Sequence, residues 1–200
     1  TILNFDTPGG ETDGVFDLAD FIFKIRGQKE IISFVHERAA SAGYLLAAAT
    51  NRIYTTQGGI SGSIGVVMQH FDKSQQNTER GVVITEIFAG AKKVVGSPNH
   101  ALSDGDLAYL QAHVDKYYDI FVSKVAQFRG MSEMDVRKTE AAIFVGDEAV
   151  RHGLVDEVVS VMNIMNVGTG AGNVSFIGNK TNVQIEQRRR IRMGDDTQAQ

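Results

Sequence analysis

Short apolar runs typical of β-strands alternate along this chain with longer runs of helical periodicity, and this alternation constrains the fold most. Strands joined by helical crossovers form a parallel sheet, so the sequence predicts an α/β fold. The expected strands are residues 2–5, 31–35, 52–55, 64–68, 82–88 and 154–161. The expected helices are residues 16–25, 41–50, 103–128, 132–140 and 147–152. Ser103 with Asp106 predicts a capping box for the long helix.

The composition changes after about residue 161, where Asn, Gly, Thr and Gln become frequent and apolar residues become rare. We therefore expect one folded domain over residues 1–161 and a polar extension over residues 162–200. This extension contains a short basic cluster, made of Arg188, Arg189, Arg190 and Arg192. The chain carries a net charge of −4 and the cluster lacks interleaved aromatic residues, which favours a solvated extension over a nucleic-acid site.

The chain begins in a strand-like run, with no initiator Met and no signal-peptide pattern before it. We interpret it as a piece of a longer protein, whose missing part could hold a targeting or anchoring segment. The longest apolar run, residues 39–50, is too short for a bilayer, which needs about 20 residues. No membrane span is evident in this piece.

Several kinds of chemistry are excluded by composition and spacing. There is no cysteine, so thiolate metal sites and cysteine nucleophiles are absent. The five histidines never occur in a metal-ligand spacing such as HExxH. The glycine-rich stretch 58–65 matches neither a dinucleotide fingerprint nor a phosphate loop. We therefore expect no metal and no cofactor.

Two loops at expected strand ends remain as candidates for a site. Gly9 and Gly10 lie where a strand turns towards a helix, and consecutive N–H groups there could bind an oxyanion. Ser41 lies at the next such junction, where helix capping is the commonest role of a serine. The small residues around it, Ala42 and Gly43, would also let a substrate approach the hydroxyl, and the Ala42 amide could be a second oxyanion donor. Neither Ser41, Ser61 nor Ser63 has the flanking glycines of a G-x-S-x-G elbow.

A serine nucleophile needs a base. His36 and His70 are the nearest histidines. The other candidates are Lys92 and Lys93, which follow small apolar residues that could desolvate an amine. A solvated surface is the ordinary place for such a pair of lysines.

Five motifs occur in an order that resembles the signal peptide peptidase A family of Ser/Lys serine proteases. They are PGG at 8–10, ASAGY at 40–44, SGSIGV at 61–66, GAKK at 90–93 and GDEAV to GLVD at 146–156. The stretches FAGAKK, VDKYYDIFVSKVAQFRG and VRKTEAAIFVGDEAV are most similar to the phage branch, the minor capsid protein C or head maturation proteases. The resemblance covers residues 1–161, and the family's first strand is missing.

The resemblance implies a Clp protease and crotonase type of fold, a spiral of βαβ units. It implies that Ser41 is the nucleophile and Lys93, beside Lys92, the general base. It also implies that Gly10 and Ala42 supply the oxyanion-hole amides, although the family usually has glycine in place of Ala42. We expect the substrate to contact three further residues: Gly9, Gly43 and Ser63.

The function implied is a serine endopeptidase that cleaves capsid or scaffold proteins during phage head maturation, in the host cytoplasm or procapsid. A homo-oligomer is expected, because the apolar face of helix 103–128 exceeds what one small sheet requires. The extension after residue 161 could begin a scaffold segment. Four alternatives remain: a membrane-associated bacterial signal-peptide-degrading relative, a Clp-type Ser/His/Asp peptidase, a crotonase-like acyl-CoA enzyme and a non-catalytic capsid assembly scaffold.

Overall fold

The computed structural model describes residues 1–164, so the basic cluster and nearly all of the polar extension lie outside the described residues. The strands are β1 (Ile2–Thr7), β2 (Ile32–Ala40), β3 (Arg52–Thr55), β4 (Ile60–Gly62), β5 (Ile143–Val145) and β6 (Glu157–Val158). The helices are α1 (Val15–Ile25), α2 (Ala42–Ala48), α3 (Ser74–Glu79), α4 (Asp104–Arg129), α5 (Glu133–Arg137) and α6 (Asp147–Arg151). The α/β fold class predicted from the sequence is confirmed.

The central strand of the six-stranded sheet is β2. β1 pairs with it in parallel, β3 pairs in parallel with its first residues, and β4 pairs in parallel with its last three. β6 pairs in parallel with β3, whereas β5 pairs antiparallel with β4. Ser41 directly follows β2, so it lies at the edge of the sheet where the parallel strands end, beside the end of β4.

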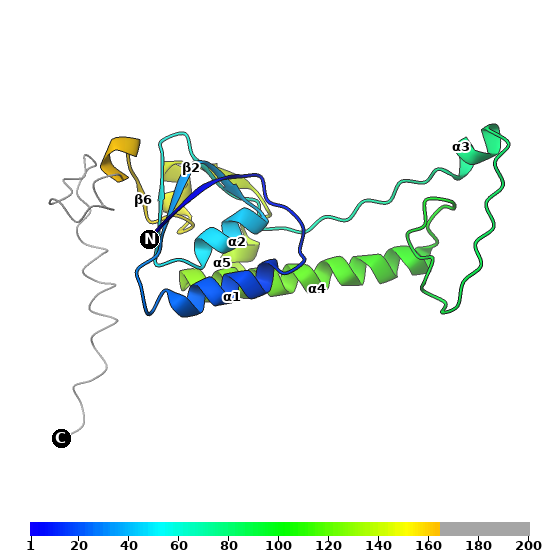
Figure 1. The fold of residues 1–200 in the computed structure, drawn as a ribbon, viewed down its shortest axis with the longest axis horizontal. Coiled ribbons are helices and arrows are strands. Elements are labelled where there is room, and N and C mark those ends of the chain that lie inside the picture. The colour runs from blue at the N-terminus through cyan, green and yellow to red at the C-terminus, as the bar shows by residue number, and fades with distance from the viewer. Residues whose placement is uncertain (165–200) are drawn as a thin grey trace, which may run out of the picture.

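Alternate residues of β2 contribute to two apolar clusters, one on each face of the sheet. Val35 and Ala39 belong to the main core, together with buried residues of α1, α2 and α4. Phe34 lies on the opposite face in a smaller cluster with Tyr54 and Val159. Figure 1 shows α1, α2 and α4 together on one side of the sheet. The helices that carry the site are therefore held by the larger of the two cores.

The long helix α4 is only partly covered by this core. The Ser103 hydroxyl accepts from the Asp106 N–H at 3.1 Å, which confirms the predicted cap, and Gly130 ends the helix with a left-handed backbone. Its buried residues all lie between Phe121 and Phe128. The N-terminal half of α4 extends beyond the body of the protein (Figure 1).

Residues 66–102, which we call the arm, leave the body after β4 and return at the start of α4, with α3 near the far end (Figure 1). Apolar side chains of the arm are strongly exposed, with 82% of Val67, 89% of Val83 and 96% of Ile87 accessible. Exposed apolar surface of this kind marks interaction sites in soluble proteins. The arm therefore has the character of a contact surface that no segment of residues 1–164 covers.

Two strand predictions are wrong for this chain. Residues 64–68 and 82–88 have no strand structure, and both lie at or beyond the base of the arm. Their β-branched residues favour extended backbone, but a strand also needs a neighbour for its hydrogen bonds. β5, which the sequence did not predict, pairs antiparallel with β4 within a sheet expected to be parallel. α3 was not predicted either.

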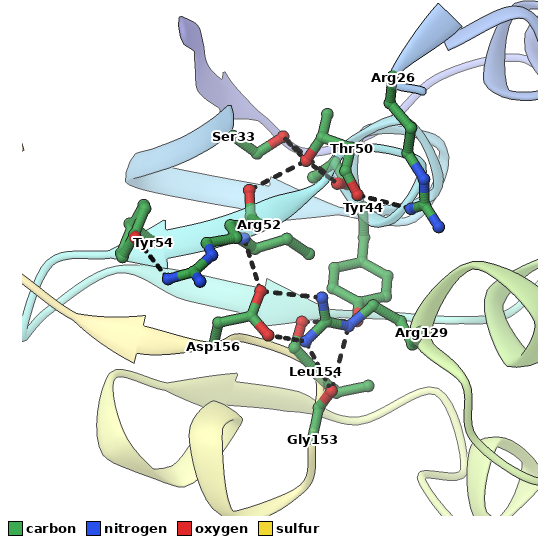
Figure 2. Close-up of polar contacts among 12 residues, drawn as sticks. Arg26, Ser33, Tyr44, Thr50, Arg52, Tyr54, Arg129, Gly153, Leu154 and Asp156 are labelled. Carbon is green, nitrogen blue, oxygen red and sulfur yellow. Dashed lines mark hydrogen bonds and ion pairs between the residues drawn. The ribbon is translucent and has the colours of Figure 1, made fainter. Parts of the chain in front are cut away.

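A buried ion pair fastens the C-terminal end of α4 to the sheet (Figure 2). The Arg129 guanidinium donates to both carboxylate oxygens of Asp156 at 3.0 Å and to the carbonyl of Gly153. The same carboxylate accepts the N–H of Ile53 on β3 at 2.7 Å. Burial opposes the charge of Arg129, but Tyr44 and Asp156 favour it more, and the pKa of Arg129 is raised. The pair links α4, β3 and the 153–156 turn.

Tyr44 joins this network from α2, the helix that follows Ser41. Its phenol donates to the carbonyl of Leu154 at 2.8 Å, and its side chain is fully buried. Burial raises the pKa of the Tyr44 phenol, so the hydroxyl stays protonated and remains a donor. The helix after Ser41 is thereby tied to the same turn that Arg129 contacts.

We expect Arg129→Ala to lower the free energy of unfolding by about 3 kcal/mol, because it leaves the partly buried Asp156 carboxylate without its cation. Only 6% of the Arg129 side chain is exposed, against 30% for Asp156, which places the loss at the lower end of the range for buried pairs. The exposed pair of Arg137 with Asp119 is the control, and Arg137→Ala should lower the free energy of unfolding far less than Arg129→Ala does. Urea unfolding of both variants measures the difference, and equal losses would contradict a special role of Arg129.

Candidate active site

Ser41 occupies a sharp turn between β2 and α2. Its backbone has φ 51° and ψ −127°, and its N–H donates to the carbonyl of Gly62 at 2.9 Å. Its side chain makes no capping hydrogen bond with α2. The helix-cap alternative is therefore wrong, and the hydroxyl is left available at the surface of the turn.

This backbone conformation is strained for a residue with a side chain, at a cost of about 1–3 kcal/mol. Close packing maintains it. A Cβ built on Gly9 would lie 2.6 Å from the Ser41 Cβ, and one built on Gly43 would collide with the Thr7 side chain. Gly43 stands at the second glycine position of an ordinary elbow, whereas the first position is Ala39, and a glycine of another loop, Gly9, packs against the serine. Strained turns held in this way are common at nucleophiles.

Gly10 and Ala42 lie together with Ser41 around one pocket. Ala42 is the first residue of α2, so its N–H has no hydrogen-bond partner within the helix, as is usual for the first turn. The Thr7 hydroxyl accepts the Gly9 N–H at 3.2 Å and shapes the loop that carries Gly10. The structure therefore brings together the predicted nucleophile and the two residues predicted to supply oxyanion donors.

The rest of this pocket is mainly apolar and was not predicted from the sequence. It encloses about 110 Å³. A cavity of about 150 Å³ accommodates benzene, so this space suits one small aliphatic side chain. Besides Thr12 and Gly65, its lining comprises Val15, Phe16, Leu45, Val66, Val67 and Phe121. These residues come from α1, α2, α4 and the base of the arm. The four segments are far apart in the sequence, so no local sequence motif predicts that they form one pocket.

The predicted substrate-contact residues lie around Ser41 but do not line this pocket. Gly9 packs against Ser41 itself, and Gly43 faces Thr7 inside the fold. Ser63 has φ 55° and its N–H donates to the carbonyl of Ala142 at 2.8 Å. Ser61, a further serine of the same loop, is fully buried and its hydroxyl has no hydrogen-bond partner in the described part of the chain. Of the three serines considered, only Ser41 opens on the pocket.

Neither candidate histidine lines the pocket. His70 lies in the arm, where its Nε2 is 2.9 Å from the carbonyl of Ser97, and His36 stacks on Phe34 at 5.9 Å between ring centroids. Within residues 1–164, no three His, Cys, Asp or Glu side chains are grouped closely enough to hold a metal ion. Over the same residues, no helix has both the length and the apolar character of a membrane span.

The structure does not bring Lys93 to Ser41 of the same chain. The turn that carries both lysines packs on the start of α4, where the Lys92 ammonium lies 5.0 Å from the centre of the Tyr109 ring. Phe121, which lines the Ser41 pocket, lies about 18 Å further along the same helix at 1.5 Å per residue. Lys93 is exposed, so its apolar neighbours in the sequence do not cover it within one chain.

Comparison with known proteins places these residues in a family. Residues 24–174 match Peptidase family S49. The chain is 39% identical over 166 residues to capsid assembly protease C of Escherichia phage lambda, and 37% identical over 177 residues to a head-tail preconnector protein of Enterobacteria phage P21. These matches cover 83% and 88% of this chain but only 38% and 35% of the relatives. A protein named as a signal peptide peptidase from Enterococcus faecium is 31% identical, covering 78% of this chain and 46% of that relative.

The fold has a solved counterpart in the 1510-N membrane-bound stomatin-specific protease. The TM-score is 0.52 at 17% sequence identity, covering 86% of this chain and 70% of that one. This likeness confirms the fold that the resemblance implied. The match over most of the chain, with the motifs of residues 40–44 and 61–66 inside it, shows that the chain belongs to Peptidase family S49.

Proposed function

We propose that residues 1–161 form a serine endopeptidase domain in which Ser41 is the nucleophile and Lys93 the general base. The observation that carries this proposal is the strained turn at Ser41, whose free hydroxyl opens on a pocket shared with Gly10 and Ala42. A serine that neither caps its helix nor lies in the core has no structural role that explains its strain. A role as the catalytic nucleophile would explain the strain.

In this mechanism the Ser41 Oγ attacks the carbonyl carbon of the scissile peptide bond, and its proton passes to the neutral amine of Lys93. The N–H groups of Gly10 and Ala42 bind the oxyanion that forms. The C–N bond then breaks, and Lys93 returns the proton to the leaving amine. Water, deprotonated by the same lysine, hydrolyses the ester on Ser41 and restores the free hydroxyl.

The lysine comes from a second copy of the chain. Within one chain the lysine turn lies at the far end of α4 from the pocket, and Lys93 is exposed. The arm that carries it exposes apolar residues such as Val83 and Ile87, which a neighbouring subunit would cover. Docking of the arm would also desolvate the amine, which favours its neutral, proton-accepting form. A head-to-tail arrangement of this kind forms a ring when the rotation between neighbouring subunits closes on itself.

Mixing two inactive variants tests both the dyad and its origin. We expect Ser41→Ala and Lys93→Ala each to be inactive alone, and a mixture of dissociated and reassembled subunits to regain part of the wild-type activity. Each restored site would combine Ser41 of one subunit with Lys93 of another. Peptide cleavage by the mixture is the measurement, with each variant reassembled alone as control. A mixture as inactive as its components would overturn the shared site.

The substrate we propose is a capsid or scaffold protein, cleaved in the host cytoplasm or within the procapsid. The support is the identity of 39% and 37% to two phage proteins whose names concern the head. The apolar pocket of about 110 Å³ favours a small aliphatic side chain beside the cleaved bond. Residues 162–200 would begin a scaffold segment that follows the peptidase domain.

The likeness to the Enterococcus faecium relative favours a second candidate, a bacterial peptidase that degrades signal peptides and is attached to the membrane outside this piece. An assay that compares cleavage of purified procapsid proteins with cleavage of free signal peptides distinguishes the two candidate functions. A non-catalytic scaffold or an acyl-CoA enzyme would not depend on Ser41, so loss of peptide cleavage in Ser41→Ala would exclude both.

A further inference from the structure

The two adjacent lysines of the arm have different surroundings. The Lys92 ammonium lies 3.7 Å from a carboxylate oxygen of Asp106 and 5.0 Å from the centre of the Tyr109 ring, both on α4. Lys93 makes no side-chain hydrogen bond, ion pair or ring contact with any residue in the described part of the chain, and it is exposed. One lysine of the pair is therefore anchored, whereas the other extends without a partner.

The partners of Lys92 are themselves fixed in place. Asp106 belongs to the cap of α4, where its carboxylate accepts the Ser103 hydroxyl at 2.9 Å, and only 24% of its side chain is exposed. Tyr109 packs against His113 with 4.5 Å between ring centroids. An ion pair is stronger when one partner is already held in position, because less side-chain entropy is lost on forming it. The cation–π contact adds to the same attachment.

The backbone of the lysine turn makes the two side chains diverge. Lys93 N–H donates to the Gly90 carbonyl at 3.0 Å, and Val95 N–H to the Lys92 carbonyl at 3.4 Å. Successive side chains in such tight turns point about 120° apart. When Lys92 faces α4, Lys93 therefore points away from the helix, in keeping with the exposure of its side chain.

The end of the turn has a second attachment. The Glu86 carboxylate accepts the Ser97 hydroxyl and the Asn99 side-chain amide, the latter at 2.8 Å. These hydrogen bonds lower the pKa of Glu86, which therefore stays ionised. Ser97 fixes the turn to the preceding extended segment, but among the described contacts the Lys92 side chain is the polar link between the lysine turn and α4.

We propose that Lys92 is a positioning residue, which holds the lysine turn on the first turns of α4 so that Lys93 projects towards the serine of the neighbouring subunit. This inference rests on the proposed function, since it needs Lys93 to be the base. It assigns different tasks to two lysines that the sequence alone cannot distinguish.

The test compares variants of both lysines in the assembled, full-length protein. We expect Lys92→Ala to lower kcat about three- to tenfold with little change in KM, the range expected when contacts of this size no longer hold the turn. Lys92→Arg should restore kcat, because a guanidinium can pair with Asp106 and stack on Tyr109. Lys138→Ala is the matched control: it removes an exposed lysine paired with Asp135 at 2.9 Å, away from the arm, and should leave kcat unchanged.

The possible outcomes distinguish a failure of the positioning role of Lys92 from a failure of the proposed function on which it rests. An active Lys93→Ala protein overturns the proposed base, and the role of Lys92 with it. If Lys93→Ala is inactive but Lys92→Ala equals the wild type, the dyad stands and the positioning role is wrong. Equal loss in Lys92→Ala and Lys92→Arg also overturns the role, because the anchor requires only the retained charge. Sedimentation of each variant confirms that subunit assembly is unchanged.

Discussion

Ser41→Ala should abolish peptide cleavage and leave stability almost unchanged. The Ser41 hydroxyl makes no capping hydrogen bond, and alanine retains the Cβ that the turn already accommodates, so we expect the free energy of unfolding to change by less than about 0.5 kcal/mol. Removal of a serine nucleophile typically lowers kcat by about 10⁴-fold or more. Cleavage assays and urea unfolding of the same preparation measure the two effects.

Ser132→Ala is the control for this variant, because it should show the opposite behaviour. The Ser132 hydroxyl does cap its helix, accepting the N–H of Asp135 at 3.1 Å. Its loss should cost about 1 kcal/mol of stability without changing cleavage. If Ser41→Ala instead lost stability as Ser132→Ala does and retained cleavage, Ser41 would be structural and the nucleophile assignment would be wrong.

The sequence predicted the features of this fold that depend on local patterns. Ser103 and Asp106 form the cap that their spacing indicates, and the junctions at Gly10 and Ser41 lie at strand ends as expected. Such features follow from residues a few positions apart, whose chemistry decides the local backbone. The α/β class follows from the same information, because it depends only on the order of elements.

Features that depend on distant residues were not predicted. The strain at Ser41 is maintained by Gly9 on another loop, and the pocket combines four separated segments. Residues 82–88 have the composition of a strand, yet no neighbouring strand pairs with them among residues 1–164. Composition reports what a segment prefers, whereas a strand also requires a partner with free hydrogen-bonding groups. In the assembly proposed above, another subunit would supply such a partner to the arm.

Lys93→Arg should be as inactive as Lys93→Ala. A general base must lose its proton before it can accept one from Ser41, and an unperturbed lysine does so only near pH 10.4. Guanidinium keeps its charge under all ordinary conditions, so arginine preserves the cation but not the base. The variant therefore separates a role in proton transfer from a role in charge or packing.

The pH dependence of the wild-type enzyme supplies the second part of this prediction. Cleavage should rise with pH, because only the neutral amine can take the Ser41 proton. Dilution that separates the subunits should abolish cleavage, because it removes Lys93 of one subunit from Ser41 of another. Lys116→Arg, an exposed substitution on α4, is the control and should retain the full pH profile. Activity in Lys93→Arg at any pH would show that another group accepts the proton, whereas its complete loss with intact assembly assigns that step to the Lys93 amine.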